Sequence, residues 1–65
     1  MNIELLKTYI QNSTFNQDAV AEEIGMNNRT WYRRMKANNF TVNEFKAIVK
    51  VLNLSKDQIF QLLNF

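Results

Sequence analysis

Apolar residues recur three and four positions apart along nearly the whole chain, and this period constrains the fold more than any other feature. Ile3, Leu6 and Ile10 show it near the start, and Phe45 and Ile48 repeat it later. Such spacing puts apolar side chains on one face of a helix. The chain has no proline and one glycine, which favours helices joined by short linkers over a sheet with repeated turns.

Residues that start and stop helices divide the first half of the chain into three segments. The period predicts a helix over residues 2–12. Asn16 is suited to cap a second, short helix, and Gly25 supplies the left-handed residue that commonly ends one. A third helix is predicted at about residues 27–36.

Two capping boxes predict the remaining helices. Thr41 with Glu44 opens a fourth helix, and Ser55 with Gln58 opens a short fifth one. Helices this short are marginal in isolation, so all five must share one core. The side chains expected to form this core are Ile3, Leu6, Ile10, Phe15, Val20, Ile24, Trp31, Met35, Phe45, Ile48, Leu52, Leu54, Ile59 and Leu63.

Length and composition exclude several classes of function. A chain of 65 residues is expected to form one domain over residues 1–65. It has no cysteine or histidine, and its carboxylates are scattered, so we expect no enzyme, no metal site and no cofactor. No apolar run reaches the roughly 18 to 20 residues of a membrane span, and the first residues are unlike a signal peptide. We therefore expect a cytoplasmic protein with no membrane partner.

The net charge of +2 is unevenly distributed. Residues 24–43 hold Arg29, Arg33, Arg34 and Lys36 and no acidic residue, a local charge of +4, while the rest of the chain carries −2. Clustered cations are typical of a phosphate-binding face. A solvated helix face is the alternative interpretation of the same run.

The segment from Gln17 to Met35 carries the residues that two crossed helices need. Helices packed at about 90 to 120 degrees across a short turn require a small residue at their closest approach, which suits Ala21. Gly25 fits the tight turn. Val20 and Trp31 supply apolar contacts that hold the angle, leaving the other face of the second helix exposed.

This segment resembles the helix-turn-helix of the lambda-repressor-like family of phage Cro and repressor proteins. Gln17, Ala21, Gly25 and Trp31 carry the resemblance, which extends with the caps over about residues 3–63. It implies an all-α, compact five-helix DNA-binding domain with its helix-turn-helix at the second and third helices. The chain departs from the family pattern at Arg34, where many members have an aliphatic residue.

The resemblance also implies the DNA contacts, because the second helix of the motif lies in the major groove. Arginine pairs with guanine and asparagine with adenine, and helix N-termini meet phosphates. The residues expected to contact bases are Asn28, Arg29, Tyr32 and Arg33. The residues expected to contact phosphates are Asn16, Gln17, Arg34, Lys36, Asn38, Asn39 and Thr41.

The end of the chain has more apolar residues than one face of a short helix needs. Some of this surplus is expected at the surface, where Phe60, Leu62 and Phe65 form a two-fold contact. A tail folded back on its own core is the alternative. A single recognition helix covers few base pairs, so we expect a weak or DNA-induced homodimer on palindromic operator DNA.

These observations predict a sequence-specific transcriptional regulator, a Cro-like repressor that occupies operator DNA in a bacterial host. No sensor segment is evident, so no small-molecule ligand is expected. The alternative from another class is an antirepressor that uses the same fold to bind a phage repressor protein.

Overall fold

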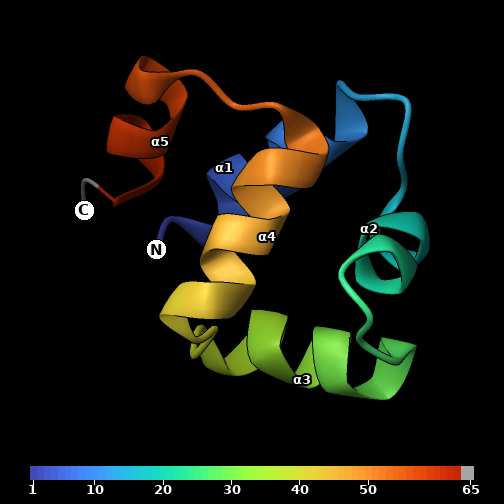
Figure 1. Cartoon of the computed structure of the whole chain (residues 1–65). Coiled ribbons are helices and arrows are strands. Elements are labelled where there is room, and N and C mark those ends of the chain that lie inside the picture. Colours follow the sequence, from blue (N-terminus) through green and yellow to red (C-terminus); the bar gives the residue numbers. More distant parts are fainter. Residues whose placement is uncertain (64–65) are drawn as a thin grey trace.

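The computed structural model describes residues 1–63 as five helices around one core (Figure 1). They are α1 (Ile3–Gln11), α2 (Gln17–Glu23), α3 (Asn28–Ala37), α4 (Val42–Leu52) and α5 (Lys56–Leu63). The described residues contain no strand, so the predicted all-α fold and the five helices in their order are confirmed.

Local hydrogen bonds explain where each helix begins. An asparagine side chain accepts the amide proton three residues later at the start of each of the first three helices. Thr41 and Glu44 form the expected reciprocal box at α4, with bonds of 2.8 and 3.1 Å. Ser55 and Gln58 do the same at α5, at 2.8 and 3.2 Å. Both predicted capping boxes are confirmed.

Left-handed residues end three of the helices. Gly25, directly after α2 and its cap, has φ of +74°, as the sequence predicts. Asn38 and Asn53 take the same region at the ends of α3 and α4, with φ of 53° and 52°. Asparagine tolerates this conformation better than most side chains, which lets both helices stop sharply before the next linker.

Trp31 lies at the centre of the core and is fully buried. Its ring packs against Phe40 with centroids 5.1 Å apart and planes tilted by 58°, a favourable aromatic geometry. The buried apolar residues are Leu6, Ile10, Val20, Ala21, Trp31, Met35, Ile48 and Leu62. Most of the predicted core is confirmed as buried or packed against this group.

The two leucines at the end of α5 exchange their predicted places. Leu62, predicted as a surface contact, is fully buried, whereas Leu63, predicted in the core, is 50% exposed. The carbonyl of Leu62 accepts a 2.7 Å hydrogen bond from the amide of Asn2, which fixes the rotation of α5 against the start of α1. Phe60 is 70% exposed as predicted, and Phe65 lies outside the described residues.

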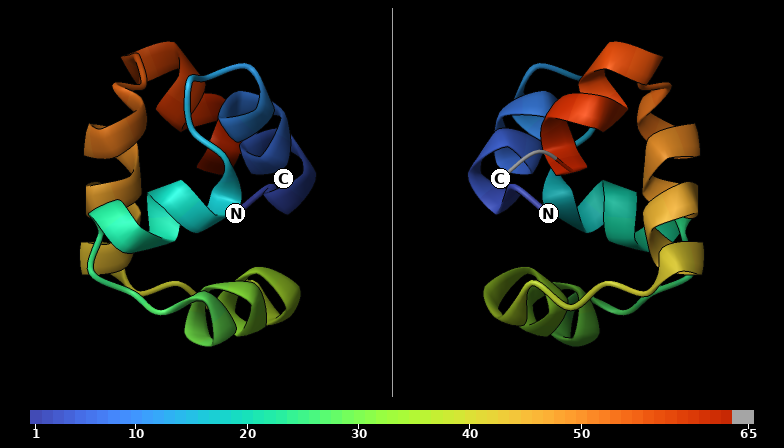
Figure 2. Two further views of the ribbon diagram at one scale, coloured as in Figure 1. Left: turned by 90° about the vertical axis from the view of Figure 1, so that its right-hand side faces the viewer. Right: turned by 90° about the vertical axis from the view of Figure 1, so that its left-hand side faces the viewer.

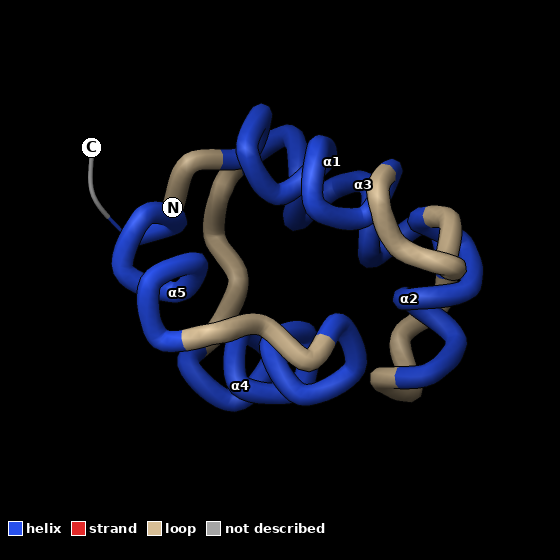
Figure 3. Tube along the Cα trace, turned by 90° about the horizontal axis from the view of Figure 1, so that it is seen from above, coloured by secondary structure: helices blue, strands red, loops and turns tan. Residues whose placement is uncertain are grey.

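The helices are arranged so that α3 occupies one edge of the molecule. Figure 1 places α3 below α4 and α2, and the two side views in Figure 2 show it at the same edge. From above, α1, α2, α4 and α5 surround the interior (Figure 3). One face of α3 therefore packs on the domain while the other faces away from it.

The burial of Leu62 in place of Leu63 can be tested by substitution. Replacing Leu62 with alanine removes a fully buried side chain and is expected to lower the free energy of unfolding by about 2 to 5 kcal/mol. The matched change Leu63→Ala is expected to cost about 1 kcal/mol or less. Urea denaturation of both variants measures the difference. Equal decreases in the free energy of unfolding would contradict the burial of Leu62 in place of Leu63.

Candidate nucleic-acid interface

The helix-turn-helix is built from α2, the turn after it and α3. Ala21 is fully buried, and its carbonyl accepts the amide of Met26 at 2.9 Å, which closes the turn. The indole Nε1 of Trp31 donates to Oε1 of Gln17 at 2.9 Å. This bond ties the middle of α3 to the first residue of α2 and fixes how the two helices cross.

The four residues predicted to contact bases lie together on the outer face of α3. Asn28, Arg29, Tyr32 and Arg33 are all exposed, and their spacing of one, three and four positions keeps them on one side of the helix. Trp31 and Met35 occupy the opposite, buried side. The structure brings these four residues together, and their contact with DNA stays a prediction.

Tyr32 has a partner that the sequence analysis did not identify. Its hydroxyl donates to Oδ1 of Asp18 in α2 at 2.9 Å. This hydrogen bond, with partial desolvation and the negative charge of Asp18, raises the pKa of Tyr32 above its usual value. The two residues are 14 positions apart on different helices, so no local spacing reveals the pair.

Besides Gln17, three of the residues predicted to contact phosphates make side-chain hydrogen bonds within the protein. Oδ1 of Asn16 caps α2 by accepting the amide of Ala19 at 2.8 Å, and the hydroxyl of Thr41 caps α4. Nδ2 of Asn38 donates to the carbonyl of Met1 at 2.8 Å, joining the end of α3 to the start of the chain. All three side chains remain exposed.

Arg34 differs from the other cations of α3 because it is half-buried. Its Nε lies 3.1 Å from Oε1 of Glu44, and the side chain is 27% exposed. The two groups form an ion pair, although the N–H is not aligned well enough for a hydrogen bond. Nε of Arg34 therefore faces α4, and the phosphate contact predicted for the rest of this guanidinium stays a prediction.

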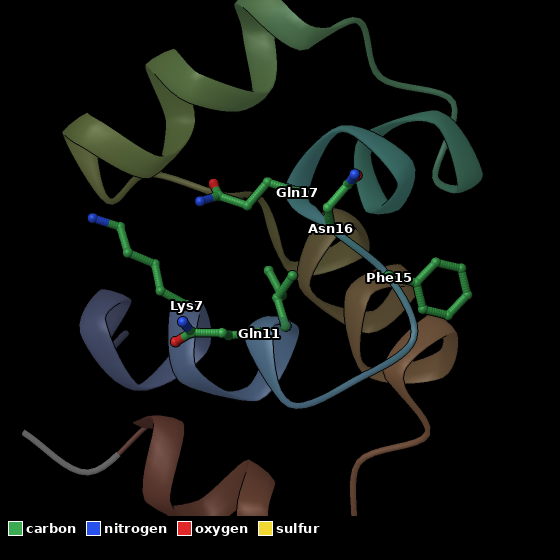
Figure 4. A pocket seen from close by; sticks show the side chains of 6 residues that line it. Lys7, Gln11, Phe15, Asn16 and Gln17 are labelled. Atoms are coloured by element: carbon green, nitrogen blue, oxygen red, sulfur yellow. The ribbon is translucent and has the colours of Figure 1, made fainter.

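Lys7 is a basic residue near α3 that the sequence analysis left outside the site. It lines a cleft of about 290 Å³ together with Gln17, Tyr32, Met35 and Lys36. Figure 4 shows its side chain extending from α1 toward the side on which the Gln17 amide lies. Lys7 also forms a 3.3 Å ion pair with Glu4, in which both side chains are solvent-exposed. Lys36 and Asn39, both predicted phosphate contacts, are exposed as well.

Two kinds of site are absent from residues 1–63. These residues contain no group of three or more acidic, histidine or cysteine side chains that could hold a metal ion. None of the helices has the length and apolar character that a membrane crossing requires.

Comparison with known families supports a helix-turn-helix DNA-binding family, but the matched family is not the lambda-repressor-like family that the sequence resembles. The model of the bacterial regulatory proteins of the Fis family, a helix-turn-helix family, matches residues 3–37, more than half of the chain. The matched residues comprise α1, α2 and α3. No curated protein and no solved structure matched the chain.

The Asp18 contact predicts how Tyr32 titrates. In a Tyr9→Phe background, which leaves Tyr32 as the only tyrosine, tyrosinate absorbance should appear at higher pH than for an ordinary phenol. Adding Asp18→Asn should return the pKa of Tyr32 toward its usual value of about 10. The hydrogen bond stabilises the fold in full below that pH and is lost as pH rises through the raised pKa of the folded state. An unchanged titration curve in the double variant would contradict the pairing.

Proposed function

Since this chain belongs to the Fis family of bacterial regulatory proteins and is a helix-turn-helix DNA-binding regulator, we propose that it is a repressor of the phage Cro type. It places α3 in the major groove of operator DNA and blocks transcription by occupying the site. The observation that carries this proposal is the outer face of α3. That face presents cations and an amide around Tyr32, while the opposite face is anchored by the buried Trp31.

Two features of the fold support the proposal of a Cro type. The helices α4 and α5 lie beyond the matched segment and complete the five-helix arrangement that the sequence resembles. The helix α4 also holds α3 in place, because Glu44 in α4 pairs with Arg34 in α3.

Each side chain of the proposed interface has a defined task. Asn28, Arg29, Tyr32 and Arg33 read base edges, with Arg29 and Arg33 able to pair bidentately with guanine. The groups that hold the backbone phosphates carry no sequence information and set the position of the domain. They are Asn16, Gln17, Arg34, Lys36, Asn38, Asn39 and Thr41.

Selection of bound sites from a random DNA pool tests this function and supplies the operator sequence. A palindromic consensus is the expected result. If the chain shows no salt-dependent affinity for duplex DNA, the alternative of an antirepressor that binds a phage repressor protein replaces the proposal.

The proposed regulator pairs on the operator through the exposed end of α5. Phe60 projects from α5 with 70% of its surface exposed, and Leu63 is half exposed nearby in the same helix. The buried Leu62 has no part in this contact. Two small domains that each cover few base pairs gain affinity by binding both half-sites together.

Substitutions on α3 should distinguish the residues that contact bases from the residues that contact phosphates. On the selected operator, Arg29→Ala or Arg33→Ala should cost about 1 to 3 kcal/mol and relax specificity at one position. Lys36→Ala should weaken binding to all sequences alike and reduce the slope of log K against log salt by about 1. Lys56→Ala in α5 is the matched control, and gel shifts at several salt concentrations provide the measurement. Equal losses on random and selected DNA for Arg29→Ala would argue against base reading.

The dimer contact has a separate test in Phe60→Ser. Because Phe60 is mostly exposed, this change should leave the melting temperature nearly unchanged. It should weaken binding to the full palindrome while leaving binding to an isolated half-site as it was. Gel shifts on the two DNA lengths measure this, and equal effects on both would place the pairing surface elsewhere.

A further inference from the structure

A cleft beside α3 is lined by side chains from three helices, and besides Tyr32 and Met35 of α3 it has two lysines and a glutamine. Lys7 comes from α1, Gln17 from the start of α2 and Lys36 from the last turn of α3. The cleft measures about 290 Å³, and a neighbouring one of about 490 Å³ shares Lys7 and Gln17 with it. Residues far apart in the sequence thus place two lysine side chains along one cleft.

The orientation of the Gln17 amide is fixed by the core. The fully buried Trp31 must place its indole N–H on an acceptor, and Oε1 of Gln17 provides it at 2.9 Å. The remaining end of the amide, Nε2, is then a donor. In Figure 4 the Gln17 side chain projects into the space that Lys7 also approaches.

Asn16, at the edge of the larger cleft, is oriented in the same way. Its Oδ1 accepts the amide proton of Ala19, which leaves Nδ2 as a donor. The hydroxyl of Tyr32 donates its hydrogen bond to Asp18. Asp18 is not among the residues that line either cleft. The oriented amides and the two lysines therefore offer donors, and a phosphate group offers only acceptors at neutral pH.

We propose that this cleft binds one phosphate of the DNA backbone, with Lys7 as a contact from α1, outside the helix-turn-helix. The inference rests on the proposed function, because Lys36 and Tyr32 connect the cleft to the face of α3 that reads bases. The ion pair of Lys7 with Glu4 does not prevent this contact. Exposed pairs at this spacing are weak, so the ammonium can exchange the carboxylate for a phosphate.

The test measures how salt affects binding to the selected operator and to random duplex DNA. Lys7→Gln should reduce the slope of log K against log salt by about 1 on both DNAs, whereas Lys7→Arg should keep it. Lys56→Gln is the matched control, since Lys56 begins α5 at the opposite end of the molecule from α3 in Figure 1. Glu4→Gln removes the competing carboxylate and should tighten binding. Equal thermal unfolding of all variants confirms that each one is folded.

The outcomes separate the two proposals. If the wild-type chain fails to bind DNA, the proposed function fails. If it binds but Lys7→Gln behaves like Lys56→Gln, the cleft assignment is overturned while the function stands. A second arm adds inorganic phosphate and follows the Gln17 side-chain amide by NMR. A Lys7-dependent shift with no change in the DNA slope would assign the cleft to a free anion and overturn the DNA assignment. A change in the DNA slope supports it.

Discussion

The fold depends on the hydrogen bond that the buried indole N–H of Trp31 donates. Trp31 has no exposed surface, and an unpaired N–H in that position would cost about 1 to 3 kcal/mol. Gln17 provides the acceptor, and Phe40 packs against the ring. The start of α2, the middle of α3 and the linker to α4 therefore meet at a single residue. The crossing of the two motif helices is a consequence of this contact.

The sequence predicts those structural features that depend on interactions between residues no more than about four positions apart. The capping pair of Thr41 and Glu44 is an interaction of this range, and so is the left-handed turn at Gly25. The inward side of α3 follows from the same period. The choice between Leu62 and Leu63 could not be predicted, because both fit the helical period of α5. The choice depends on contacts with a distant part of the chain, among them the packing of α5 on α1 and the backbone hydrogen bond from Asn2.

The cations of the candidate site likewise cannot be predicted from neighbouring residues in the sequence alone. Residues 24–43 hold four cations along the sequence, but the structure turns Nε of Arg34 toward Glu44. The helix packing also places Lys7 of α1 along the same cleft as Lys36. The cations on this side of the molecule therefore come from two helices, and their arrangement depends on the folded chain.

The recognition helix is held at three points, each by a different part of the chain. Trp31 binds it to α2, Arg34 pairs with α4, and Asn38 at its end donates to the carbonyl of Met1. A helix fixed in this way loses little conformational freedom when its outer side chains meet a partner, which leaves more of the contact energy for discrimination between sequences. Short helices are marginal in isolation, so the position of α3 depends on these contacts with the rest of the chain.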